Sequence, residues 1–113
     1  MKHADVCLVP FPFTDGSASK VRPVVVVSID EFNRGDDVVV VPISSQPSLN
    51  DPYSVSVASS SPFFAATGLK TSSAIKWNKL MTISQKLLKR RLGRMHEDLM
   101  VQVSKQIVSM ISC

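Results

Sequence analysis

The stretch VPFPFTDGSASKVRPVVVVS (residues 9–28) joins two apolar runs through a loop of small polar residues. Its second run contains four consecutive valines at 24–27, and an unbroken β-branched run is typical of a strand that is buried on both faces. Residues 5–11, DVCLVPF, predict a partner strand, and Arg22 and Pro23 stand where the second strand begins. The stretch therefore predicts two strands joined by a polar loop.

Further strand signals follow, each a short apolar or alternating run bounded by polar residues. They are VVVVPISS (38–45), SVSV (54–57), SSAIKW (72–77), KLMTI (79–83) and RRLGRM (90–95). Residues 59–68 predict a connecting loop, and SQKLL (84–88) predicts a short helical turn. Only the tail has helical spacing, because its apolar residues recur at intervals of three and four. They are Leu99, Val103, Ile107, Met110 and Ile111.

We expect this apolar stripe of the tail helix to pack against the sheet. The predicted fold is therefore mainly β, a small and mostly antiparallel barrel with a C-terminal helix. A chain of 113 residues, 44% of them hydrophobic, fits a single domain over residues 1–113. Its longest apolar run is too short to span a membrane, and the N-terminus lacks the apolar core of a signal peptide, so a cytoplasmic protein is expected. Cys7 and Cys113 form neither a disulfide framework nor a metal-ligand spacing.

Charge is unevenly distributed along the chain. All nine carboxylates lie between Asp5 and Asp51 or at 97 and 98, whereas residues 52–96 contain eight cationic residues and no acidic one. The eight are Lys70, Lys76, Lys79, Lys86, Lys89, Arg90, Arg91 and Arg94. Such a segment is either a solvated face or the binding surface of a polyanion, such as nucleic acid or an acidic protein segment.

Five segments, taken in order, resemble the MazF/PemK family of toxin endoribonucleases. They are DVCLVPFPFTDGS (5–17), RPVVVVS (22–28), VPISSQ (41–46), TGLKTSSAIK (67–76) and LGRM (92–95) before a helix. The resemblance implies an SH3-like β-barrel with a C-terminal helix that forms a homodimer. It also implies metal-independent, sequence-specific cleavage of single-stranded RNA at short sequences, without a cofactor. It further implies inhibition by a cognate antitoxin, which in such systems usually supplies an acidic segment.

The resemblance places the family's catalytic pair on Arg22 and Ser44. The family's arginine precedes a proline at the start of the second strand, as Arg22 precedes Pro23. Its hydroxyl partner is usually a threonine, so Ser44 is a departure that keeps the hydroxyl but loses the methyl group that restricts χ1. Ser45 is an alternative hydroxyl, although strand alternation turns it to the opposite face.

Metal-free cleavage means that the neighbouring 2′-oxygen attacks phosphorus, which leaves a 2′,3′-cyclic phosphate and a 5′-hydroxyl. A guanidinium fork matches the phosphorane oxygens on which charge develops, so we expect Arg22 to stabilise them. We expect Ser44 to position the 2′-oxygen or to contact the phosphate. The expected RNA contacts are Thr14, Lys20, Ser45, Gln46, Lys70, Ser73 and Lys76.

The proton acceptor has no clear candidate, because His3 and His96 are the only imidazoles and each is expected to be a surface or helix-capping residue. Two other functions stay open. One is a CcdB-like toxin, which acts on a protein target such as DNA gyrase and does not depend on an arginine and hydroxyl pair. The other is an inactive barrel that binds nucleic acid.

Overall fold

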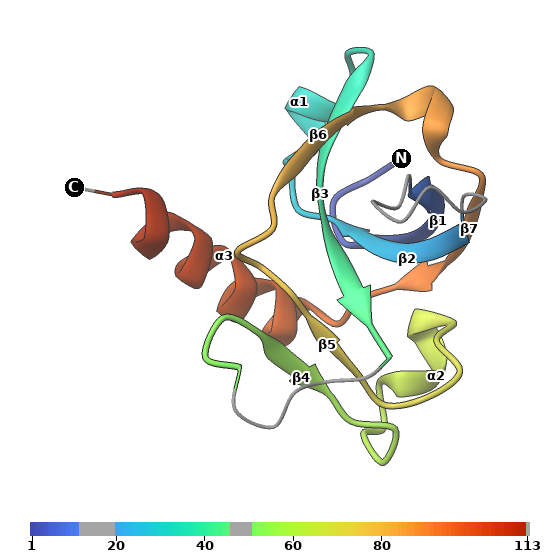
Figure 1. Cartoon of the computed structure of the whole chain (residues 1–113), viewed down its shortest axis with the longest axis vertical. Coiled ribbons are helices and arrows are strands. Elements are labelled where there is room, and N and C mark those ends of the chain that lie inside the picture. Colours follow the sequence, from blue (N-terminus) through green and yellow to red (C-terminus); the bar gives the residue numbers. More distant parts are fainter. Residues whose placement is uncertain (12–19, 46–50, 113) are drawn as a thin grey trace.

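The computed structural model describes residues 1–11, 20–45 and 51–112, in which the predicted strands, the short turn and the tail helix follow one another in the predicted order (Figure 1). The strands are β1 (Asp5–Phe11), β2 (Lys20–Val26), β3 (Asp37–Ser44), β4 (Val55–Val57), β5 (Ser73–Ile75), β6 (Met81–Ser84) and β7 (Arg90–Arg94). The helices are α1 (Asp30–Asn33), α2 (Phe64–Thr67), the 3₁₀ turn η1 (Gln85–Leu87) and α3 (Glu97–Ile111). None of the helices described is long and apolar enough to cross a membrane.

Strand β3 is the centre of a curved antiparallel sheet. The strand order is β4-β5-β3-β2-β1-β7, and β6 pairs with β3 beside this path. β6 covers the first half of β3, whereas Ile43 and Ser44 at its end pair with β5. The sheet curls round on itself in Figure 1, so the prediction of a mainly β barrel with a C-terminal helix is confirmed.

The valine run of β2 is buried on both faces, as predicted. Val24 and Val26 pack in one cluster with Cys7, under β6 and η1. Val25 points the other way, into a second cluster that contains Met100 of α3. All three valines are 0% exposed, and burial of a valine side chain stabilises a fold by about 1.5–3 kcal/mol. The two clusters hold the strands that carry Arg22 and Ser44 in place.

Helix α3 packs on the sheet through its N-terminal half. Val103 is 0% exposed, and Leu99 and Ile107 pack against the same cluster. The predicted stripe is wrong at its end, because Met110 and Ile111 are 42% and 65% exposed. Figure 1 shows the reason: the C-terminal part of the helix projects beyond the strands, so no sheet lies beneath these two residues.

Helix α2 lies within residues 59–68, where the sequence predicted only a loop. It packs closely on β7 because two glycines, Gly68 and Gly93, leave room for the backbones. A Cβ at Gly93 would lie 2.1 Å from the carbonyl oxygen of Ala66, and one at Gly68 would lie 2.2 Å from that of Leu92. Gly68 also ends α2 with φ 73°, in the left-handed region that favours glycine.

Candidate active site

Arg22 and Ser44 lie at the same end of the sheet on adjacent strands. The β2–β3 ladder ends at the pair of Val24 and Pro42; Arg22 stands two residues before Val24, and Ser44 stands two residues after Pro42. Because side chains two residues apart share a face, both side chains lie on the face of Val24. Val9 of β1 is paired with Arg22 on its other side. The two predicted catalytic residues therefore stand at the end of a buried apolar cluster that fixes their backbones.

Exposure at this end suits a polar ligand. Arg22 is exposed and Ser44 is half-buried, whereas Val9 and Val24 beneath them are at most 2% exposed. A guanidinium that starts from a rigid strand has a defined origin, because Pro23 restricts the preceding residue to an extended backbone. The arrangement places an exposed arginine and a half-buried serine at the same end of two adjacent strands.

The other predicted RNA contacts divide into three groups. Lys20 is the first residue of β2, opposite Phe11 at the same end of the sheet as Arg22, and Ser45 is exposed directly after β3. Lys70 is exposed in the connection between α2 and β5. Thr14 and Gln46 lie outside the described residues. The roles of all five stay predictions.

Ser73 and Lys76 have partners within the chain. Ser73 is 4% exposed, and its hydroxyl donates a hydrogen bond of 2.8 Å to the carbonyl oxygen of Thr71. The ammonium of Lys76 forms an ion pair with the carboxylate of Asp51, with side chains only 14% and 20% exposed. The hydrogen bond from Lys76, together with that from the backbone N–H of Tyr53, holds the pKa of Asp51 below its usual value.

Two positive charges of residues 52–96 are neutralised by carboxylates that lie outside this segment of the sequence. Arg91 Nε lies 3.0 Å from Asp5 Oδ1, and Lys76 is paired with Asp51. Asp5 lies 86 residues from Arg91 in the sequence, and Asp51 lies 25 residues from Lys76. These two pairs form because the order of the strands brings distant residues together. The six other cations of the segment are exposed: Lys70, Lys79, Lys86, Lys89, Arg90 and Arg94.

Both histidines have structural contacts, as predicted. His96 is the N-cap of α3, where its Nδ1 accepts a hydrogen bond of 3.1 Å from the N–H of Asp98, and its ring stacks on Phe63. His3 Nδ1 lies 3.3 Å from the carbonyl oxygen of Ser28, at the opposite end of β2 from Arg22. Within residues 1–11, 20–45 and 51–112, no group of three His, Cys, Asp or Glu side chains is placed to hold a metal ion.

Cys7 is buried in the apolar cluster of β2. Burial raises the pKa of its thiol to about 11, and the nearby carboxylate of Asp5 acts in the same direction. A thiol with a raised pKa holds little thiolate near neutral pH and is a poor nucleophile. Cys7 is therefore a packing residue.

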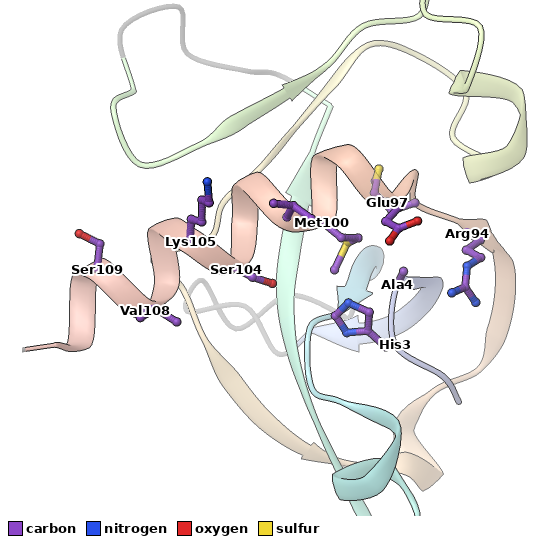
Figure 2. Close-up of a pocket in the computed structure, with 11 residues that line it drawn as sticks. His3, Ala4, Arg94, Glu97, Met100, Ser104, Lys105, Val108 and Ser109 are labelled. Atoms are coloured by element: carbon purple, nitrogen blue, oxygen red, sulfur yellow. The ribbon is translucent and has the colours of Figure 1, made fainter.

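A groove of about 730 Å³ runs along α3, away from Arg22. Its floor is apolar, with Ala4, Met100 and Val108, and polar side chains such as Arg94 and Lys105 stand at its edges (Figure 2). It lies between α3 and the chain segments of His3–Ala4 and Arg94–Met95, beside the side of the helix that packs on the core. The groove is a second surface of the molecule, separate from the candidate active site.

Comparison with known proteins agrees with this architecture. A family model described as the PemK-like, MazF-like toxin of type II toxin–antitoxin systems matches residues 2–111. No curated protein matches the chain at a significant level.

Several solved structures share the fold. They include toxin MazF-mt6 of Mycobacterium tuberculosis (20% identity, 93% of each chain covered, TM-score 0.71). A mycobacterial endoribonuclease in complex with its cognate antitoxin has 17% identity, 96% and 92% coverage of this chain and of that chain, and a TM-score of 0.75. A MazE–MazF complex from Deinococcus radiodurans has 15% identity, 98% and 95% coverage and a TM-score of 0.75. At these identities the likeness shows a common fold.

Proposed function

Because this chain belongs to the PemK-like, MazF-like toxin family of type II toxin–antitoxin systems, we propose that it is a metal-independent endoribonuclease that cleaves single-stranded RNA. Its substrate is messenger RNA in the cytoplasm, and its inhibitor is a cognate antitoxin. Two structures of the same fold support this proposal. One is the MazE–MazF complex, and the other is the endoribonuclease in complex with its cognate antitoxin.

The matching positions of Arg22 and Ser44 carry the proposal. In-line attack by the 2′-oxygen places negative charge on the phosphorane oxygens, and Arg22 offers them a planar fork of N–H donors. Ser44 holds the 2′-oxygen or a phosphate oxygen through its hydroxyl. The bond from phosphorus to the 5′-oxygen breaks, so the products are a 2′,3′-cyclic phosphate and a 5′-hydroxyl. Water or Arg22 takes the proton from the attacking 2′-hydroxyl, and the leaving 5′-oxygen gains a proton to become the 5′-hydroxyl.

Lys20, Ser45 and Lys70 extend the site along the RNA, with Thr14 and Gln46 as further contacts. Phosphate contacts by lysine supply affinity without sequence information. The acidic segment of the antitoxin is attracted by the same charges, so antitoxin and RNA compete for one surface.

The chain acts as a homodimer through the exposed face of α3. Val101 and Val108 on this face are 48% and 59% exposed, and they line the groove of Figure 2. An apolar helix face that projects beyond its own sheet is a typical interaction surface. We assign this face to contact with the same face of a second copy of the chain, because the two subunits of a two-fold symmetric dimer meet through identical surfaces.

Charge complementarity favours an antiparallel pair of α3 helices. Glu97 and Lys105 each lie four residues from Val101, in opposite directions. A two-fold axis at Val101 therefore places Lys105 of one copy, about 6 Å along the helix, beside Glu97 of the other. Two symmetric ion pairs would then flank the apolar contact.

The activity is tested with purified protein and a long single-stranded RNA in EDTA. Cuts are mapped by primer extension, and the new 5′ ends are labelled with polynucleotide kinase with and without prior phosphatase treatment. The proposal expects cuts in EDTA whose 5′ ends accept label directly, as 5′-hydroxyls do. Cuts that require a divalent metal contradict it. An intact RNA together with inhibition of DNA gyrase would favour the CcdB-like alternative, and RNA binding without cleavage would favour an inactive barrel.

A further inference from the structure

Lys76 lies on the same face of the sheet as Ser44. Ser44 is paired with Ala74 of β5, and the N–H of Lys76 donates a hydrogen bond of 2.9 Å to the carbonyl oxygen of Pro42. The register of this pair therefore continues past the end of β5. Because Lys76 follows Ala74 by two residues, its side chain lies on the face of Ser44, as a diagonal neighbour.

The side chain of Lys76 ties β5 to the chain that leads into β4. Its ammonium is paired with Asp51, whose second carboxylate oxygen accepts a hydrogen bond of 2.8 Å from the N–H of Tyr53. The hydroxyl of Ser54 donates to the carbonyl oxygen of Asp51. Beside this pair, the ring of Tyr53 makes an edge contact with Trp77 at 5.7 Å between centroids. Asp51 is thus held by backbone and side-chain contacts of its own.

These contacts strengthen a weak point of the fold. β5 has three residues, with two cross-strand pairs to β3 and three to β4. Such short ladders have little stability of their own. The ladders of β3 with β2 and β6 end at Pro42 and Val40, so Ser44 at the end of β3 takes its cross-strand register from Ala74 of β5.

From this we infer that Lys76 and Asp51 are positioning residues for Ser44: their ion pair fixes β5, which in turn fixes the hydroxyl beside Arg22. This inference rests on the proposed cleavage activity for its kinetic readout. It differs from the sequence prediction, which gave Lys76 a direct contact with RNA. The side chain of Lys76 is 14% exposed and its ammonium is paired with a carboxylate, so little of the ammonium is accessible to a phosphate.

The two roles predict different kinetics, which four variants separate. They are Lys76→Gln, Asp51→Asn, the exchanged pair K76D/D51K, and Lys86→Gln. The last is the control, because it removes the same positive charge from a lysine on η1. Positioning predicts that each single variant lowers kcat about 10-fold with KM changed less than about 2-fold, since small misplacements of a catalytic group are costly. The exchanged pair then restores part of kcat, because it restores the attraction but not the acceptor that Asp51 offers to the N–H of Tyr53, and Lys86→Gln resembles the wild type.

A direct RNA contact predicts the opposite pattern. Lys76→Gln would raise KM, Asp51→Asn would tighten RNA binding, and the exchanged pair would stay impaired. That pattern overturns the inference.

A readout independent of activity keeps the inference separate from the proposed function. Amide hydrogen exchange at Ala74 and at residue 76 should be faster in both single variants, should return in the exchanged pair, and should be unchanged in Lys86→Gln. Unchanged exchange in the single variants overturns the inference even if RNA is cleaved. Faster exchange in a protein that cleaves no RNA contradicts the proposed function and leaves the structural role of the pair in place.

Discussion

Arg22 and Ser44 occupy matching positions on β2 and β3, two residues beyond the cross-strand pair of Val24 and Pro42. Both side chains lie on one face because the register of the two strands is fixed by buried valines on either side. The two strands thereby bring an exposed arginine and a half-buried serine to the same end of the sheet.

Ser44→Ala should lower kcat for RNA cleavage about 10²-fold, because it removes one preorganised hydroxyl from the site. Ser44→Thr keeps the hydroxyl and adds a methyl group that restricts χ1, so it should keep at least wild-type activity. Single-turnover cleavage of one defined RNA measures both, with Ser60→Ala in the exposed loop after β4 as the control. If Ser45→Ala abolished cleavage and Ser44→Ala did not, the assignment by strand alternation would be wrong.

Gly93→Ala should lower the free energy of unfolding by about 1–3 kcal/mol, because the new Cβ would meet the backbone of α2. The nearest atom, the carbonyl oxygen of Ala66, would be 2.1 Å away. Gly35→Ala is the matched control, since its Cβ would meet nothing closer than 3.6 Å and should change stability by about 0.5 kcal/mol or less. Urea denaturation measures the two midpoints, and equal midpoints would contradict the close packing of α2 on β7.

Glu97→Lys and Lys105→Glu should each weaken self-association, and the double variant should restore it. The single variants place like charges opposite each other across the two-fold axis, whereas the double variant exchanges the signs. Sedimentation equilibrium measures the dissociation constants. Asp98→Lys, which changes the same charge in the same helical turn at a residue that is 83% exposed, controls for effects on the helix end. If all variants dimerise as the wild type does, α3 is not the interface.

The sheet and the tail helix were predictable because their signals are local. The valine run of β2 requires burial on both faces, and the spacing of Leu99, Val103 and Ile107 is that of a helix packed on a surface. The end of that stripe was wrong, because a sequence pattern does not tell where the sheet beneath Met110 stops. The four-residue helices α1 and α2 were missed, since so short a helix completes little more than one turn and shows no period.

Arg22 and Ser44 were predicted from their motifs, but the pairing of Lys76 with Asp51 was not. The sequence places Lys76 in a segment without acidic residues, and its partner lies just outside that segment. Which carboxylate meets which cation depends on the order of the strands, as it does for Arg91 and Asp5. The charge distribution along the sequence therefore does not show that Lys76 and Arg91 are paired with carboxylates.

The most direct test of the central claim is the rate of RNA cleavage in EDTA by Arg22→Ala, compared with wild type and with Arg34→Ala. Arg34 is an exposed arginine beside α1, at the opposite end of β3 from Ser44, and carries the same charge. Removal of one preorganised donor predicts a loss of about 10²–10³ in rate for Arg22→Ala and none for Arg34→Ala. Equal cleavage by Arg22→Ala and wild type would show that Arg22 does not stabilise the transition state.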